Sequence, residues 1–133
     1  MESTIFQVED DEDFSFIMEH ALKEINKNIK IVVSTNRSDA IVQLNQYKEN
    51  NEAPGLILLD INLKGLSGID ILKIIREMSF FDLVPVVIFS TSDEPKDIKT
   101  ALEFGATEFC TKPLGYYELV KSLEMLYAKY LNL

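Results

Sequence analysis

The chain has 133 residues, of which 47% are hydrophobic and 26% are charged, and its formal net charge at pH 7 is −9. This length and composition are typical of one globular domain and exclude disordered, collagen-like and coiled-coil chains. The negative charge repels phosphate backbones and acidic lipids, so we expect neither nucleic acid nor a membrane as a partner. The single cysteine, Cys110, cannot form an internal disulfide. Together with the lack of a basic and apolar leader, it indicates a cytoplasmic protein.

Short apolar runs alternate along the chain with segments of helical periodicity. The apolar and β-branched runs predict strands at 5–8, 29–33, 56–59, 86–89 and 108–111. Apolar residues at helical spacing predict helices from Phe14 to Ile25, Ile41 to Lys48, Ile71 to Met78, Ile98 to Leu102 and Tyr116 to Tyr130. Ser38 is expected to cap the second helix, while Pro95 opens the fourth helix and Gly105 closes it.

This alternation of strands and helices determines the fold class. Strands joined by helical crossovers form a parallel sheet with helices on both faces, so the prediction is an α/β, doubly wound domain. Ligands of such sheets bind beyond the carboxyl ends of the strands. The residues that end strands are therefore the candidates for chemistry.

The predicted strand ends carry three acids, a hydroxyl and an amine. In chain order these residues are Glu9, Asp10, Asp60, Ser90 and Lys112. Clustered carboxylates stay ionised together only beside a cation, and an all-oxygen site suits Mg²⁺. With the metal and Lys112 in place, the Asp60 carboxylate could attack phosphorus and form an acyl phosphate. Simpler readings stay open: Asp60 and Ser90 could only support turns, and the two acids could only begin a helix.

Four short motifs at these strand ends carry a resemblance to a known family. They are Val8-Glu9-Asp10-Asp11, Leu59-Asp60-Ile61-Asn62, Phe89-Ser90 and Thr111-Lys112-Pro113. Together they resemble the receiver domain of bacterial two-component response regulators, in particular the stand-alone, chemotaxis-type receivers. The resemblance implies a flavodoxin-like sheet of five parallel strands in the order 2-1-3-4-5. It further implies one receiver domain over residues 1–133, with no output domain.

The resemblance assigns a role to each of these residues. Asp60 is expected to be the phosphoacceptor, and Glu9, Asp10, Asp60 and the backbone carbonyl of Asn62 are expected to hold Mg²⁺. Lys112 is expected to pair with Asp60 and then with its phosphate.

The resemblance also implies a switch. Ser90 would be the switch hydroxyl and Phe109 the switch aromatic, although Phe109 could equally be an ordinary core residue. The bond between Lys112 and Pro113 is expected to be cis. Glu9, Ser90 and Phe109 replace the Asp, Thr and Tyr that are commoner in the family, but no essential functional group is lost.

The function implied is a phosphoaccepting switch rather than a turnover enzyme. A sensor histidine kinase or a histidine phosphotransfer protein would supply the phosphoryl group. An unknown downstream protein, or a second copy of the chain, would bind the face formed by the fourth helix, fifth strand and fifth helix, near Phe104, Tyr116, Tyr117 and Met125. His20 is expected to be exposed and without a role.

Two alternatives come from other functional classes. The chain could be an interaction module that keeps the fold without using phosphate. It could also be an aspartate-nucleophile phosphatase similar to the haloacid dehalogenases. That family needs a second aspartate two residues after the nucleophile, where this chain has Asn62.

Overall fold

A computed structural model describes residues 3–63 and 66–131 of the chain; Lys64 and Gly65, in the predicted loop after the third strand, lie outside the described residues. The main sheet consists of β1 (Thr4–Val8), β2 (Lys30–Ser34), β3 (Leu56–Leu59), β6 (Val86–Ser90) and β7 (Glu108–Thr111). Its strand order is β2-β1-β3-β6-β7 and every neighbouring pair is parallel. The predicted order 2-1-3-4-5 is therefore confirmed.

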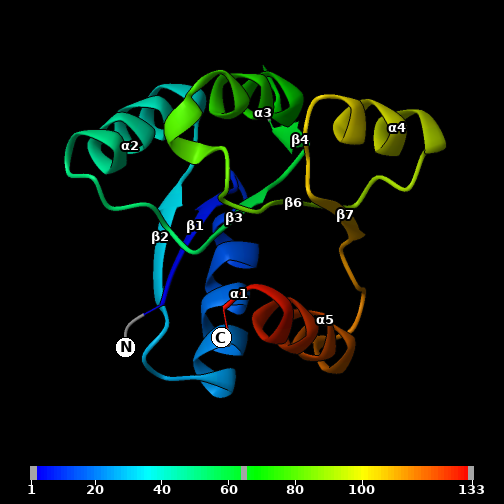
Figure 1. Cartoon of the computed structure of the whole chain (residues 1–133). Coiled ribbons are helices and arrows are strands. Elements are labelled where there is room, and N and C mark those ends of the chain that lie inside the picture. Colours follow the sequence, from blue (N-terminus) through cyan, green and yellow to red (C-terminus); the bar gives the residue numbers. More distant parts are fainter. Residues whose placement is uncertain (1–2, 64–65, 132–133) are drawn as a thin grey trace.

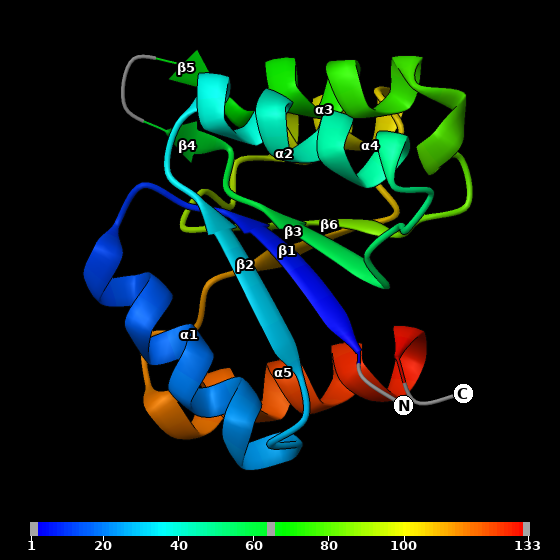
Figure 2. The same ribbon diagram turned by 90° about the vertical axis from the view of Figure 1, so that its left-hand side faces the viewer.

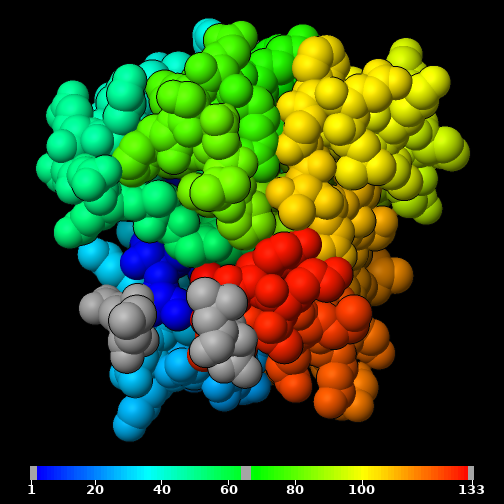
Figure 3. Space-filling model, viewed as in Figure 1, coloured from blue at the N-terminus to red at the C-terminus, as the bar shows by residue number. Residues whose placement is uncertain are grey.

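The helices form one layer on each face of this sheet. They are α1 (Glu12–Ile25), α2 (Arg37–Glu49), α3 (Gly68–Glu77), α4 (Pro95–Glu103) and α5 (Tyr116–Tyr130), with a short 3-10 helix η1 (Ser79–Phe81). The helices α2, α3 and α4 cover one face, and α1 and α5 cover the other (Figures 1 and 2). In the space-filling view, the layer of α2, α3 and α4 lies above the layer of α1 and α5 (Figure 3). Within the described residues, no helix has the length and apolarity needed to cross a membrane.

The third strand is buried on both sides, which explains its unbroken apolar sequence. Ile57 and Leu59 pack into the cluster under α2, α3 and α4, whereas Leu56 and Leu58 pack into the cluster under α1 and α5. Successive side chains of a strand point to opposite faces, so a strand between two helical layers needs apolar residues at every position. This rigid central strand delivers Asp60 to the edge of the sheet.

Three local details differ from the predictions. Asn36, not Ser38, caps α2: its side chain accepts a hydrogen bond from the Asp39 N–H at 2.8 Å. The loop after β3 contains an unpredicted two-stranded hairpin, in which β4 (Asn62–Leu63) pairs with β5 (Leu66–Ser67). Ile17, one of the apolar residues whose spacing predicts the first helix with an apolar inner face, is 41% exposed. Each difference depends on how neighbouring segments pack, which periodicity does not describe.

Arg76, near the end of α3, fastens the loops at the end of the sheet opposite the candidate residues. Its guanidinium donates to the carbonyls of Gly105 at 2.9 Å, Phe81 at 2.8 Å and Val84 at 3.1 Å. Gly105 follows the end of α4 with φ +100°, a left-handed conformation that favours glycine. The predicted closure of α4 at Gly105 is confirmed.

Gly105→Ala should therefore destabilise the protein. The left-handed backbone costs an alanine about 1–2 kcal/mol, and its Cβ would lie 2.9 Å from Cγ of Arg76. Gly105→Asn is the matched control, because it adds the same Cβ but tolerates the left-handed region better. Urea unfolding should show a larger loss of unfolding free energy for alanine than for asparagine. Equal losses would mean that contact with Arg76, rather than backbone conformation, explains the requirement for glycine.

Candidate functional site

The carboxyl ends of four strands bring the predicted residues to one edge of the sheet. Glu9 and Asp10 follow β1, Asp60 follows β3, Ser90 ends β6 and Lys112 follows β7. All of them except the fully buried Ser90 line a hollow of about 690 Å³. Its lining residues are Glu9, Asp10, Asp11, Glu12, Asp13, Asp60, Asn62, Thr91 and Lys112. The hollow is thus strongly acidic, and Lys112 forms part of its wall.

Three carboxylates form the centre of the site. Glu9, Asp10 and Asp60 each place one oxygen within 4.8 Å of the others. Glu9 and Asp60 are buried, and Asp10 is half-buried. Like charges this close repel one another strongly when little water lies between them. Oxygen ligands of this kind fit a hard divalent cation such as Mg²⁺, which takes a few carboxylates and keeps several waters.

Within the described residues, the ammonium of Lys112 is the positive charge that lies among these three carboxylates. Its ammonium lies 2.6 Å from Oε1 of Glu9 and 3.1 Å from Oδ2 of Asp60, and its side chain is only 10% exposed. The contact with Asp60 was expected, but the shorter contact with Glu9 was not. The longer side chain of glutamate, compared with the commoner aspartate, was the available signal for it.

Asp60 serves both a turn and the acidic site. Its Oδ1 accepts a hydrogen bond from the Asn62 N–H at 3.0 Å, while its Oδ2 contacts Lys112. The turn reading and the chemical reading of this residue are therefore compatible. Gly68 lies against this turn from the far end of the following hairpin. Its N–H donates to the Ile61 carbonyl at 2.9 Å, and a Cβ there would lie 2.0 Å from the Asp60 carbonyl oxygen.

Ser90 lies fully buried beside the acidic cluster. Its hydroxyl oxygen accepts hydrogen bonds from the Asn62 side-chain amide and from the Ser92 N–H, both at 3.3 Å. The backbone N–H of Lys112 donates to the Ser90 carbonyl at 2.7 Å. The predicted metal contact of Asn62 is through its backbone carbonyl, and the contact between its side chain and Ser90 is an additional finding.

The remaining predicted residues have mixed outcomes. Phe109 is half-buried and packs against the core beneath α2, α3 and α4.

The bond between Lys112 and Pro113 was expected to be cis but is trans, as are the peptide bonds throughout the described residues. The prediction was wrong because the two isomers of an X–Pro bond differ by only about 0.5–1 kcal/mol, which sequence alone does not resolve. The expected exposure of His20 is confirmed, since 65% of its side chain is accessible.

Phe14 belongs to the site, although the sequence indicated only a place on the apolar face of its helix. Its ring centroid lies 4.2 Å from the Lys112 ammonium. The same ring packs against Phe89, with centroids 6.2 Å apart. An aromatic residue three positions beyond a capping aspartate was the only sequence signal, and it does not reveal a lysine 98 positions away.

Burial has a direct electrostatic consequence for Glu9. Removal from water raises the pKa of this carboxyl above its ordinary value of 4.5, the hydrogen bond and charge of Lys112 lower it in part, and Asp60 raises it further. The folded protein without metal therefore holds the Glu9 proton more tightly than the unfolded chain. Stability associated with Glu9 is present below pH 4.5 and is lost as pH rises through the higher folded-state pKa.

Lys112→Met should destabilise the metal-free protein, because it leaves buried carboxylates without their counter-charge. At neutral pH we expect a loss on the order of 3 kcal/mol. The pKa of Glu9 should rise further in this variant, so the loss should shrink as pH falls toward 4.5. Urea unfolding in a chelating buffer at several pH values measures this.

The matched control is Lys129→Met. Lys129 is 51% exposed and pairs with Glu108 at 3.2 Å. Loss of such a surface pair costs less than about 1 kcal/mol. A loss for Lys112→Met that is small, or constant over the pH range, would contradict the electrostatic account.

Comparisons with known proteins agree with this geometry. The family model of the response regulator receiver domain matches residues 5–124. The transcriptional regulatory protein YcbL of Bacillus subtilis is 35% identical over 112 residues, covering 84% of this chain and 45% of YcbL. The alkaline phosphatase synthesis regulator PhoP of the same organism is 27% identical over 119 residues, covering 90% of this chain and 46% of PhoP. The chain thus spans less than half the length of these two relatives.

Solved structures show the same fold. The phosphorylated cyanobacterial phytochrome response regulator RcpA superposes with a TM-score of 0.88 at 26% identity, covering 98% of this chain and 95% of RcpA. The Mn²⁺-bound response regulator Rcp1 superposes with a TM-score of 0.77 at 23% identity, covering 95% of this chain and 92% of Rcp1. Receiver domains bind Mg²⁺ through an acidic cluster and are signalling switches rather than turnover enzymes. The chain belongs to the family of response regulator receiver domains, which carry phosphorelay signals in two-component systems.

Proposed function

We propose that this protein accepts a phosphoryl group on Asp60 from a histidine kinase or a histidine phosphotransfer protein. The observation that carries the proposal is the buried contact of Lys112 with both Asp60 and Glu9, inside a cluster of three carboxylates. An Asp60 carboxylate oxygen attacks the phosphorus of a phosphohistidine. The new O–P bond forms as the P–N bond breaks, and the electron pair of that bond leaves with the imidazole nitrogen.

Glu9, Asp10, Asp60 and the backbone carbonyl of Asn62 are the residues that we propose hold Mg²⁺. The three carboxylate oxygens lie close enough together to share one ion. When bound, Mg²⁺ would offset negative charge on the phosphoryl oxygens. The Mn²⁺-bound state of Rcp1, a protein of the same fold, supports a divalent cation in such a domain.

Lys112 supplies the second compensating charge. Its ammonium already contacts Oδ2 of Asp60, so it lies beside a phosphoryl group attached to that carboxylate. Water attack on the phosphorus then releases inorganic phosphate and restores the Asp60 carboxylate. The switch thus resets itself without a separate enzyme.

Ser90 and Phe109 are the proposed switch residues. The Ser90 hydroxyl oxygen accepts hydrogen bonds from Asn62 and Ser92, which leaves its own proton available to donate toward a phosphoryl oxygen. Movement of Ser90 toward that group would change the space beside Phe109, because Phe109 lies on β7 opposite Ile88 of the same strand as Ser90. The aromatic ring can then adopt a second rotamer.

The face formed by α4, β7 and α5 is the proposed output surface. Large apolar side chains are exposed on these two helices or at their ends, namely Leu102, Phe104, Tyr117 and Met125. Exposed apolar groups of this size are typical of protein interfaces. We propose that an unidentified downstream protein, or a second copy of the chain, binds this face after phosphorylation.

Incubation with acetyl phosphate and Mg²⁺ should add one phosphoryl group, about 80 Da, as expected for an acyl phosphate. Intact-mass spectrometry measures the gain. Asp60→Asn should abolish the gain, because it removes the nucleophile, and a chelator should reduce it strongly in the parent protein.

A gain that persists in Asp60→Asn would place the phosphoryl group on another residue and contradict the proposed acceptor. If the parent shows no gain, a purified histidine kinase replaces acetyl phosphate as donor. Failure with both donors would favour an interaction module that does not use phosphate.

Phosphorylation should also change hydrogen exchange on the output surface. We expect altered amide protection over 95–103 and 108–121, because Ser90 and Phe109 adjoin α4 and β7. The helix α2, 37–49, serves as an internal control that should stay unchanged. Changes limited to the loops that hold Glu9 and Asp60 would show that the signal does not reach the proposed surface.

A further inference from the structure

The ammonium of Lys112 is enclosed by three groups of different chemistry. Glu9 Oε1 and Asp60 Oδ2 contact it at 2.6 Å and 3.1 Å, and the centroid of the Phe14 ring lies at 4.2 Å. The face of an aromatic ring attracts a cation through its quadrupole, and more strongly where water is excluded. With 10% of the lysine side chain exposed, little water competes for the ammonium. The ring is thus a third partner of Lys112.

The position of this ring is fixed by the residues around it. Asp11 caps α1, and its carboxylate accepts hydrogen bonds from the N–H groups of Asp13 at 3.0 Å and Phe14 at 3.2 Å. These bonds fix the first turn of the helix and with it the backbone of Phe14. The ring also packs against Phe89, the residue before Ser90. Phe14 is therefore held between the start of α1 and the end of β6.

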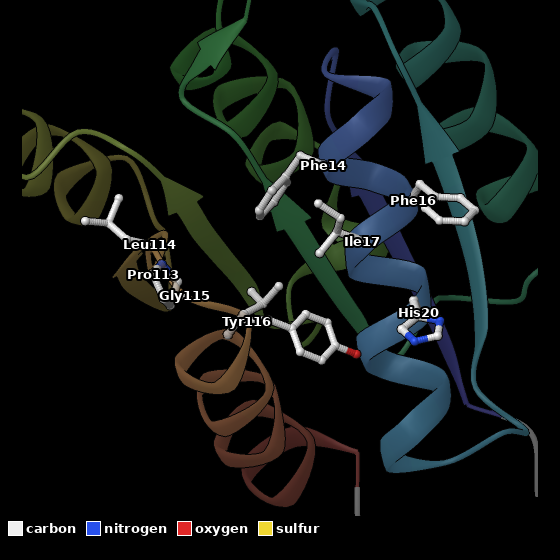
Figure 4. Close-up of a pocket in the computed structure, with 9 residues that line it drawn as sticks. Phe14, Phe16, Ile17, His20, Pro113, Leu114, Gly115 and Tyr116 are labelled. Atoms are coloured by element: carbon white, nitrogen blue, oxygen red, sulfur yellow. The ribbon is translucent and has the colours of Figure 1, made fainter.

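Phe14 also lines a neighbouring apolar groove. This groove of about 540 Å³ lies between α1 and the chain around Pro113, and Ile17 and Tyr116 contribute to its walls. Figure 4 shows Phe14 and Ile17 extending from α1 and Tyr116 extending from α5 into the space between the two helices. An aliphatic side chain at position 14 could fill the same space in this groove. Attraction of the Lys112 ammonium by the side chain at this position, in contrast, requires the face of an aromatic ring.

We propose that Phe14 is a positioning residue for phosphoryl transfer. Its ring holds the Lys112 ammonium against Asp60, so that the positive charge is already in place when phosphoryl oxygens arrive. Without the ring, the flexible lysine side chain can move toward water and must be reordered in the transition state. This inference rests on the proposed function, because it concerns the rate at which Asp60 is phosphorylated.

Phe14→Leu tests the inference, with Phe14→Met as a second variant that keeps more of the side-chain volume. At saturating acetyl phosphate and Mg²⁺, the rate constant for phosphorylation should fall about five- to tenfold in both, as expected for loss of one partly buried cation–π contact. Phe14→Tyr keeps the ring and should restore the rate to within about twofold of the parent. Ile17→Val, in the same groove, should leave the rate unchanged.

NMR provides a readout that does not depend on phosphorylation. The ring current of Phe14 should shift the ε-methylene protons of Lys112 upfield in the parent protein and in Phe14→Tyr. The shift should be lost in Phe14→Leu and Phe14→Met and kept in Ile17→Val. Urea unfolding of each variant identifies any that fail to fold.

The possible failures are distinguishable. If the parent protein is not phosphorylated, the proposed function fails, whereas the NMR shift still decides whether Phe14 holds Lys112. If the parent reacts and Phe14→Leu reacts equally fast, the positioning role is wrong. Equal slowing of Phe14→Leu and Ile17→Val would assign the effect to groove packing and would overturn the proposal.

Discussion

The repulsion among carboxylates crowded at one edge of the sheet is the interaction on which the arrangement of the site depends. Three carboxylates approach within 4.8 Å of one another, and two of them, Glu9 and Asp60, are buried. Burial strengthens their repulsion and raises the pKa of Glu9. The ammonium of Lys112, which follows β7, offsets part of this negative charge. The turn at Asp60 and the ring of Phe14 can both be understood as means of holding these charges in a fixed arrangement.

The parallel sheet makes this arrangement possible. Its strands all end at the same edge, so residues as far apart in sequence as Glu9 and Lys112 meet without a long loop between them. The core beneath supplies the rigidity, because β3 is clamped between two apolar clusters. The site thus combines an electrostatically unfavourable cluster with a scaffold stable enough to hold it. A bound cation would reduce the repulsion among the carboxylates and so raise the free energy of unfolding.

Periodicity predicted the fold class and the meeting of the strand-end residues at one edge of the sheet, whereas the strand order came from the resemblance to receiver domains. Alternating strands and helices imply a parallel sheet, and a parallel sheet brings Asp60 and Lys112 to one edge. The contacts within the site were less predictable. Whether Lys112 lies nearer to Glu9 or to Asp60 depends on differences of a fraction of an ångström in side-chain positions. Whether Asn36 or Ser38 caps α2 depends on the backbone conformation just before the helix. The place of Phe14 was missed because its partner is remote in sequence.

Arg76 holds the segment that follows α4, at the end of the sheet opposite the acidic site. At the far end of the molecule, its guanidinium fastens Gly105 and the loop before β6 by hydrogen bonds to three carbonyls. At the near end, α4 is joined to the strand that ends in Ser90 by a short linker, in which the Ser92 hydroxyl donates to Asp97 at 2.6 Å. The helix α4 is therefore held by different contacts at its two ends, through Gly105 to Arg76 after its last residue and through Asp97 to the segment after Ser90 near its first. A displacement of Ser90 would act on α4 through its Pro95 end, while the segment after its other end stays bonded to Arg76.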